Sequence, residues 1–393
     1  MTSIPQDFDP EAPEDFESAH RDYARLRGEC PVAHTEGLGG FWALSRYDDV
    51  KRAASDSATF ITSVQNVIPK IAFTGRRPPL HLDPPEHTPY RKALNPLLSL
   101  ERSEAFAPKT RELARELLAP MVAAGGGDIC VGFSSHFPVH VFGEWMRMPE
   151  EWLETLHDAG RAFILAVHMN HPERMKDTSL KLYEMARALI AIRREHPEDP
   201  AVDPVSALLE ARHEGQPLPE ELLVGTVRQV LLVGLVAPMV MMGSISVHLA
   251  GDPVLQQQLR ENPALIPDAI EEFLRLYTPY RGFARTAVRD VELHGRTIPA
   301  GEGIALLYCS ANRDESVFPQ GDQFVMSRPN IGEHLAFGRG PHNCPGLHLG
   351  RMELRVALEE LLAATPGGFA LDGEITMSRW PEIGPLVVPL RFG

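Results

Sequence analysis

The sequence predicts a single domain that is mainly α-helical and has a minor β-sheet region. Apolar residues recur at helical spacing over long segments, whereas the segments with strand-like patterns are short. No internal repeat, low-complexity tract or linker divides the 393 residues. Residues 1–393 are therefore expected to form one unit, in which residues 1–20 are a loosely ordered N-terminal segment.

The predicted helices share the apolar spacing of an amphipathic or buried helix, and three of them begin at a proline, which is favoured in a first turn. They cover residues 101–124, 149–167, 179–194, 219–250, 263–277 and 346–364. The predicted strands are short and lie between turn residues; His294-Gly295 marks a turn within the second of them. They cover residues 40–45, 290–298, 303–308 and 386–392.

Residues 230–250 contain no Asp, Glu, Lys or Arg, a length of apolar chain that is compatible with a membrane span. The segment nevertheless carries Ser244, Ser246 and His248, lies in the middle of the chain and has no second span beside it. A helix that is apolar on all sides is also expected at the centre of a large helical protein. We therefore predict a buried central helix and no membrane partner.

Composition narrows the classes of function. The formal net charge of -15 argues against nucleic-acid binding, which needs a concentrated basic surface. The N-terminus lacks the basic start and apolar run of a signal peptide. Cys30, Cys130, Cys309 and Cys344 lie far apart without a C-x-x-C pair, which argues against a disulfide framework or a zinc site. A cytoplasmic location is predicted.

One cysteine lies in a distinctive segment. Residues 337–346 read Phe-Gly-Arg-Gly-Pro-His-Asn-Cys-Pro-Gly and precede an apolar-periodic helix. The two inner glycines permit a tight turn, and the Cys344 sulfur is expected near the first unpaired N–H groups of that helix. The positive end of a helix dipole favours a thiolate, and a thiolate can ligate a metal.

The complete string F-G-x-G-x-H-x-C-x-G resembles the haem-binding loop of the cytochrome P-450 superfamily, in particular its soluble bacterial members. The resemblance implies a cytochrome P-450-like single-domain fold and haem b with the Cys344 thiolate as the axial iron ligand. By the same resemblance, Phe337 packs near the sulfur, His342 reaches a haem propionate, and Gly346 belongs to the cofactor-binding loop.

Other segments extend the resemblance from about residue 47 to residue 392. Glu272 and Arg275 share one helix face, and the resemblance implies that they form a buried structural clamp with Arg328. Haem propionates need cationic or hydrogen-bonding partners in an apolar pocket. The resemblance assigns this role to three further residues: His87, Arg91 and Arg285.

The central helix departs from the family pattern. The family carries an acid and an alcohol that manage water and protons at this point, but Val236 and Ala237 stand there, or Ala237 and Pro238 in the register shifted by one. Pro238 lacks an N–H donor and crowds the carbonyl of Gly234, so the helix distortion that the family uses as an oxygen pocket should persist. These four residues, with Cys344, are the catalytic candidates.

Three activities are compatible with the missing acid–alcohol pair. The substrate or ordered waters could deliver protons in an ordinary monooxygenase, peroxide could replace oxygen and electrons in a peroxygenase, or the haem could perform N–O cleavage, nitrene transfer or nitric oxide reduction. A haem-binding or gas-sensing protein without turnover is the non-enzymatic alternative. The resemblance favours the monooxygenase, acting on a small molecule of secondary metabolism with electrons from a separate ferredoxin and ferredoxin reductase.

Arg281 provides a hypothesis about the substrate. It lies four residues before Arg285, where the family usually faces its substrate, and a buried arginine requires an anion. We therefore predict a carboxylate-bearing substrate, the alternative being that Arg281 turns to a propionate or an exposed acid. Phe283, Leu235 and Met239 are the other substrate candidates. The resemblance places the cavity walls at residues 61–74, 163–169, 232–239 and 382–384.

Overall fold

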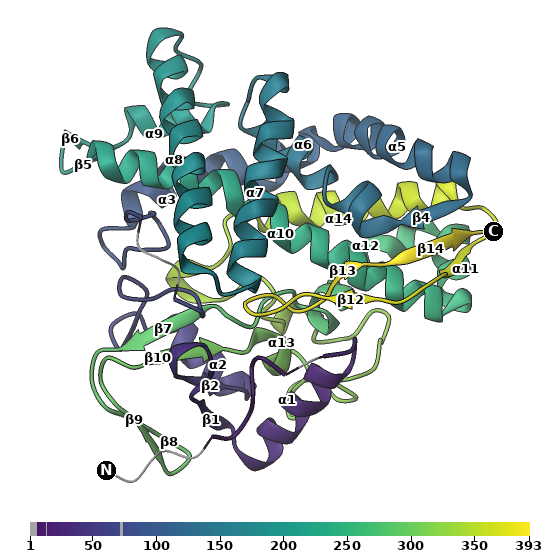
Figure 1. Cartoon of the computed structure of the whole chain (residues 1–393), viewed down its shortest axis with the longest axis horizontal. Coiled ribbons are helices and arrows are strands. Elements are labelled where there is room, and N and C mark those ends of the chain that lie inside the picture. The colour runs from purple at the N-terminus through teal and green to yellow at the C-terminus, as the bar shows by residue number, and fades with distance from the viewer. Residues whose placement is uncertain (1–5, 13, 71–73) are drawn as a thin grey trace.

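The computed structural model describes residues 6–12, 14–70 and 74–393. Helices make up most of it, and the five small sheets lie at separate places around them (Figure 1). The predicted fold class, mainly α with a minor β-sheet region, is confirmed.

The helices are longest in the middle and at the end of the chain. Their bounds are α1 (Ser18–Glu29), α2 (Tyr47–Ser55), α3 (Thr88–Leu94), α4 (Leu100–Ala105), α5 (Ala107–Ala124), α6 (Phe137–Trp145), α7 (Leu153–His168), α8 (Pro172–Glu195), α9 (Pro204–Glu210), α10 (Glu220–Gly251), α11 (Pro253–Glu261), α12 (Ile266–Leu276), α13 (Tyr308–Ala311) and α14 (Leu347–Ala364). The six predicted helices correspond to α5, α7, α8, α10, α12 and α14. The segment 101–124 forms two helices, α4 and α5, which are separated at Phe106.

The main sheet has five strands in the order β1-β2-β10-β7-β3. Its bounds are β1 (Val32–Thr35), β2 (Phe41–Leu44), β3 (Phe60–Ile61), β7 (Ala284–Ala287) and β10 (Gly303–Leu306). The predicted strands 40–45 and 303–308 are β2 and β10, which pair in parallel. The smaller elements are β4 (Gly126–Asp128), β5 (Arg212–His213), β6 (Gln216–Pro217), β8 (Val291–Leu293), β9 (Arg296–Ile298), β11 (Phe369–Leu371), β12 (Thr376–Met377), β13 (Pro385–Val387) and β14 (Pro389–Phe392).

Two of the predicted strands are subdivided. Residues 290–298 form the hairpin of β8 and β9, and the turn residues His294 and Gly295 have φ values of 48° and 74°, as the prediction of a turn requires. Residues 386–392 are divided between β13, which pairs with β12, and β14, which pairs with β11 and β4. The chain therefore changes sheets at this point.

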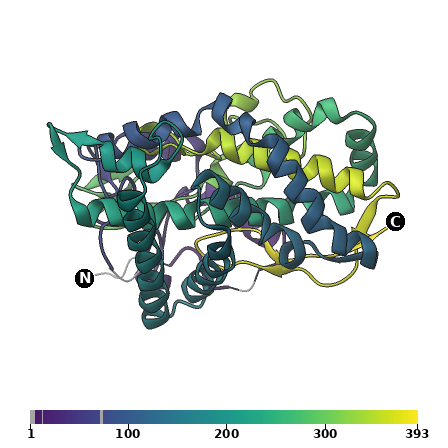
Figure 2. The same ribbon diagram turned by 90° about the horizontal axis from the view of Figure 1, so that it is seen from above.

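Helix α10 crosses the middle of the molecule and packs against α6, α8 and α14 (Figures 1 and 2). Its most apolar window is long enough for a membrane span, but 72% of that window is buried inside the protein. The side chains that make this helix apolar on all sides therefore contact other helices, as predicted for a central helix. Helix α14 lies beside α5 (Figure 2).

Hydrogen bonds join Asp7 to the neighbouring strands. The Asp7 amide donates to the His34 carbonyl at 2.8 Å, and the His34 amide donates to the Asp7 carboxylate at 2.7 Å. Arg296 also binds this carboxylate. These bonds attach Asp7 to β1 and β9, whereas the loose order of residues 1–20 stays a prediction.

A buried carboxylate joins α12 to the segment that leads to the cysteine loop. Glu272 and Arg275 are completely buried, and Arg275 donates to both carboxylate oxygens at 2.8 and 2.7 Å. Arg328 donates to the same carboxylate at 3.1 Å. Although burial opposes ionisation, the hydrogen bonds from Arg275 and Arg328 lower the pKa of Glu272.

The clamp also orders the following loop. Arg275 donates to the carbonyls of Asn312 and Gly321, each at 2.7 Å, and the Asn312 side chain accepts a bond from the Leu335 amide at 2.6 Å. Because Leu335 lies two residues before Phe337, the path of the cysteine loop begins at a position that Arg275 and Asn312 define.

Replacing Glu272→Gln should lower the free energy of unfolding by about 3–5 kcal/mol, because two buried guanidinium groups lose their counter-charge. Urea unfolding at neutral pH measures this loss. The folded state lowers the Glu272 pKa, so this contribution is present above the unfolded pKa and is lost as the pH falls. The difference between variant and wild type should therefore shrink in acid.

Asp268→Asn is the matched control, since this carboxylate lies on the same helix and makes an exposed bond to Ser327. Its loss should stay below about 1 kcal/mol. An equally small loss for Glu272→Gln would show that the clamp is not a main support of the fold.

Candidate active site

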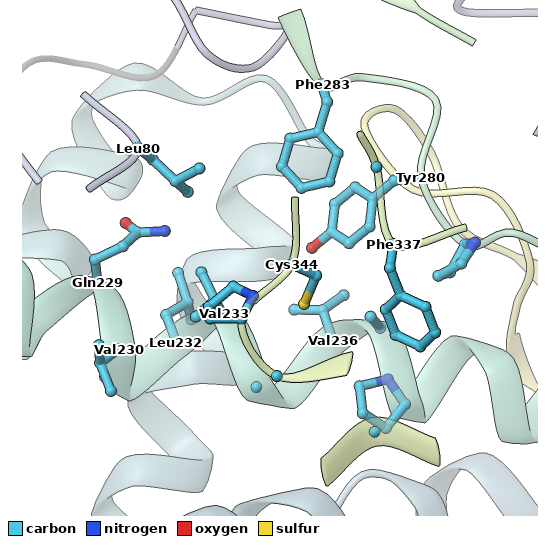
Figure 3. Close-up of a pocket in the computed structure, with 18 of the residues that line it drawn as sticks. Leu80, Gln229, Val230, Leu232, Val233, Val236, Tyr280, Phe283, Phe337 and Cys344 are labelled. Carbon is cyan, nitrogen blue, oxygen red and sulfur yellow. The ribbon is translucent and has the colours of Figure 1, made fainter. Parts of the chain in front are cut away.

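A cavity of about 330 Å³ lies between α10 and the cysteine loop (Figure 3). Most of its walls are apolar side chains of α7, α10, α14 and the loops that face them. All four cysteines belong to the described residues, and among them only Cys344 lines this cavity. The sulfur and Val236 of α10 lie on facing walls (Figure 3).

Two glycines shape the cysteine loop. Gly338 and Gly340 have φ values of 70° and 73°, a region that other residues rarely adopt. A Cβ at Gly340 would also lie 2.6 Å from the carbonyl oxygen of Ala54. A hydrogen bond from the Cys344 amide to the Phe337 carbonyl, at 2.7 Å, joins the two ends of the loop. In this conformation the sulfur lines the cavity.

Burial raises the pKa of the Cys344 thiol, although the Gly346 backbone hydrogen bond and the charges of Arg91 and Arg351 oppose the shift. The expectation that the helix start alone favours a thiolate is therefore too simple. A bound metal ion deprotonates a coordinating thiol, so ligation itself would supply the missing stabilisation of the thiolate.

Two arginines line the cavity on the side of the cysteine, of which Arg285 is buried and Arg91 is half-buried. Arg91 donates to the Asn343 carbonyl at 2.8 Å and to its side-chain oxygen at 2.9 Å, and Arg285 donates to the Ala284 carbonyl at 2.9 Å. Neither guanidinium has a carboxylate partner among the described residues, and the remaining residues of the chain include no Asp or Glu. Cations without a carboxylate partner in a cavity wall fit an anionic cofactor group such as a haem propionate.

The two histidines with predicted propionate contacts lie in different places. His342 lines the cavity, and its Nε2 atom is 3.3 Å from Thr62 Oγ1 and 3.8 Å from Asp83 Oδ1. His87 does not line the cavity. Its Nε2 atom lies 3.2 Å from the Pro341 carbonyl oxygen, so it contacts the cysteine loop, and its contact with a propionate stays a prediction.

The face of α10 opposite the cysteine consists of Gly234, Val236, Ala237 and Pro238. Both registers considered from the sequence therefore place aliphatic residues on this wall. Helix α10 continues through Pro238 as one helix. A Cβ at Gly234 would lie 2.3 Å from the ring of Phe142, so this glycine is needed for the close approach of α6.

Two of the substrate candidates on α10 are turned away from the cavity. Leu235 and Met239 are four residues apart, so they share a helix face, and neither lines the cavity. The Leu235 side chain points towards Gly160 of α7, where an added Cβ would lie 3.0 Å from it. The predicted substrate contacts of both residues are therefore wrong, whereas Phe283 does line the cavity.

Arg281 also fails as a substrate contact. It is buried, but it donates to the Glu14 carboxylate at 2.6 Å, to the Tyr23 hydroxyl at 3.1 Å and to the Glu382 carbonyl at 2.9 Å. Its counter-charge therefore comes from the N-terminal segment, and Arg281 does not line the cavity.

Three ionisable residues near Arg281 received no chemical role in the sequence analysis, which placed residues 163–169 and 382–384 only in the cavity walls. Tyr280 and Glu382 line the cavity, and the Glu382 carboxylate lies 2.6 Å from Nε2 of the buried His168. Figure 3 shows the Tyr280 hydroxyl directed into the cavity. Burial, together with a hydrogen bond to Glu382, raises the pKa of Tyr280. The sequence did contain a signal for them, because His168 and Glu382 are ionisable residues within segments that were predicted to form mostly apolar cavity walls.

Comparison with known proteins identifies the family. The family model described as cytochrome P-450 matches residues 161–364. Mycinamicin IV hydroxylase/epoxidase of Micromonospora griseorubida is 34% identical over 384 residues, which are 94% of each chain. The chain belongs to the cytochrome P-450 family. Nocardicin C N-oxygenase of Nocardia uniformis subsp. tsuyamanensis is also 34% identical, over 88% of each chain.

Solved structures agree with this assignment. A mutant of the mixed-function cytochrome P-450 MycG, in complex with mycinamicin IV, has a TM-score of 0.82 and 30% identity, and the match covers 96% of this chain and 98% of that one. A mutant of EryK in complex with erythromycin B has a TM-score of 0.85 at 28% identity and covers 96% of each chain. This cytochrome P-450 is thus an oxidoreductase whose cofactor is haem with a cysteine thiolate ligand.

Replacing Arg285→Leu should accelerate haem transfer to an excess of apomyoglobin by roughly 10- to 100-fold, because a charged hydrogen-bonding partner of a propionate is lost. The apoprotein should not become less stable, since the variant removes a buried cation without a carboxylate partner. Arg289→Leu removes an exposed guanidinium four residues later and should leave the transfer rate unchanged. Equal rates for wild type and Arg285→Leu would exclude a propionate contact.

Proposed function

We propose that this cytochrome P-450 is a cytoplasmic monooxygenase that transfers one oxygen atom from O₂ to a small organic molecule. Its electrons come from a separate ferredoxin and ferredoxin reductase. The observation that carries the proposal is the cavity in which a single cysteine faces the aliphatic wall of α10. The relatives support the reaction class, since they are named as a hydroxylase/epoxidase and an N-oxygenase.

In this proposal the Cys344 thiolate would hold the haem iron, and Arg91, Arg285 and His342 would hold the propionates. When bound, the haem would supply oxygen activation, which an electron-donating thiolate favours. Phe337 covers the cavity floor next to the sulfur, and its ring lies 4.5 Å from the Arg351 guanidinium. The apolar walls exclude water from the substrate, as small-molecule sites usually do.

Protons would reach the cavity from the side of Glu382 rather than from α10. Val236 and Ala237 offer no proton donor, whereas Glu382 lines the cavity and is hydrogen-bonded to His168. The imidazole can return a proton to the carboxylate. The raised pKa of Tyr280 opposes loss of its proton, so Tyr280 orients the carboxylate as a hydrogen-bond donor. We therefore assign proton delivery to Glu382 and His168.

The origin of the oxygen atom in the product tests the proposal. The haem-loaded enzyme is incubated under ¹⁸O₂ with NADH, ferredoxin and reductase, and with hexanoate, decanoate, tetradecanoate or mycinamicin IV as probes. Mass spectrometry should detect one labelled oxygen atom in a product. Product formation from peroxide alone would instead support a peroxygenase, and the absence of oxygen transfer under both conditions would contradict oxygenase activity.

Replacing Glu382→Gln should lower product formation per NADH by about 100-fold or more, which is the contribution expected from a positioned proton donor. Peroxide release should rise correspondingly. Adding Val236→Asp and Ala237→Thr to this variant should restore part of the yield, because an acid and an alcohol then line the cavity on α10.

Glu374→Gln, an exposed change in the same C-terminal region, is the control and should behave as wild type. Thermal unfolding of the holoenzyme separates the proton role from a structural one, since the melting temperature should change little. An unchanged yield in Glu382→Gln would exclude Glu382 as the proton source.

A further inference from the structure

A second pair of buried arginines lines the cavity at the end that lies away from the cysteine. Arg228 on α10 is completely buried and Arg77 is 5% exposed, and both belong to the cavity wall. Figure 3 shows their neighbour Gln229 at one end of the α10 segment and Val236 beside Cys344. Val236 follows Arg228 by eight residues, a distance of about 12 Å along a helix.

The contacts of Arg228 are all with neutral groups. It donates to Ser179 Oγ at 3.0 Å and approaches the side-chain oxygen of Gln229 at 3.5 Å. Its guanidinium lies 4.7 Å from the Phe163 ring centre and 5.9 Å from that of Tyr183. The Nε atom of Arg228 and the hydroxyl of Tyr183 are buried without a hydrogen-bond partner among the described residues.

Arg77 also contacts a neutral side chain and no carboxylate among the described residues. Its Nη2 atom lies 3.2 Å from Nε2 of His81, and its own Nε atom is buried without a partner among the described residues. Burial, together with the charges of Arg77 and Arg228, lowers the pKa of His81 to about 3, so this imidazole is neutral at pH 7. Nothing among these neighbours balances the two positive charges.

The fold brings these two charges together at a cost. A Cβ at Gly225, one turn before Arg228, would lie 1.9 Å from the carbonyl oxygen of Arg76, so the glycine allows the loop with Arg77 to lie directly on α10. Burial and the charge of Arg77 both lower the pKa of Arg228. Two uncompensated cations in a cavity wall destabilise a protein unless an anion binds between them.

The chain supplies no such anion. No described carboxylate pairs with Arg77 or Arg228, and the remaining residues of the chain contain no Asp or Glu. The two propionates of haem b already account for Arg91 and Arg285 on the cysteine side. A further anion is therefore required for the second pair of arginines.

We propose that Arg77 and Arg228 bind an oxyanion of the substrate, a carboxylate or a sulfate or phosphate ester, and so define the substrate class of this enzyme. The guanidinium forks suit such groups, and Tyr183 can donate a further hydrogen bond. The substrate then extends from this anion along the apolar cavity for about 12 Å towards Cys344. This inference rests on the proposed function, in that the ligand is taken to be the molecule that is oxidised.

Isothermal titration calorimetry of the haem-loaded ferric enzyme tests the inference without electron donors. Hexanoate, decanoate and tetradecanoate are each compared with the alcohol of the same chain length. At least one carboxylate should bind the wild-type enzyme more tightly than the alcohol of the same length. Arg228→Met should lower the affinity for that carboxylate by roughly 10- to 100-fold and leave the affinity for the alcohol unchanged. Decyl sulfate distinguishes a carboxylate from an ester as the oxyanion of the substrate. If decyl sulfate binds more tightly than decanoate, a sulfate or phosphate ester is favoured.

Arg187→Met is the matched control, because Arg187 is exposed and lies over the outer side of the Tyr183 ring at 5.8 Å. It should leave every affinity unchanged. Arg228→Lys keeps the charge without the fork and should retain part of the preference. A structural arginine would lower the melting temperature when replaced, whereas Arg228→Met should maintain or raise it.

If Arg228→Met does not fold, Arg77→Met on the adjoining loop provides the same comparison. Equal affinity of wild type for each carboxylate and its alcohol overturns the inference, as does a preference that survives both arginine variants. Because the measurement involves no turnover, an enzyme that fails to transfer oxygen can still show the preference. Conversely, loss of the preference leaves the monooxygenase proposal intact.

Discussion

The buried carboxylate of Glu272 is the interaction on which the position of the sulfur depends. Two arginines donate to it from different segments, and Arg275 continues to backbone carbonyls of the loop that precedes the cysteine. A buried ion pair contributes little net stability over an apolar packing, but it tolerates few alternative geometries. The clamp therefore fixes a path for residues that have little secondary structure of their own.

The second constraint is the burial of α10. Because most of this helix is packed against protein, the residues that line the cavity are determined by the orientation of the helix among its neighbours. Gly225 and Gly234 permit the closest approaches, to the loop with Arg77 and to the ring of Phe142. One face of the helix thereby presents aliphatic residues to Cys344 at its middle and a guanidinium nearer its start.

Particular residues show what the sequence could and could not reveal. The cysteine loop was predictable because Gly338 and Gly340 have backbone angles that few other residues adopt. The pairing of Arg281 was not, because its partner Glu14 lies 267 residues away. Short strands such as β1 and β7 escaped prediction since their stability comes from distant neighbours. The predicted substrate contact of Leu235 was wrong because a shift of one residue along a helix turns the side chain by about 100°.

Electrostatics connects the missing acid on α10 with the arginines on the same helix. Two unit charges about 12 Å apart interact by about 1.4 kcal/mol at an effective dielectric constant of about 20. A carboxylate at the position of Val236 would therefore repel a substrate anion bound at Arg228 and weaken its binding about tenfold. Glu382 lies outside α10 and is hydrogen-bonded to the buried His168. Under the proposals made above, the cavity thus admits an anionic substrate because proton delivery has moved from α10 to Glu382 and His168.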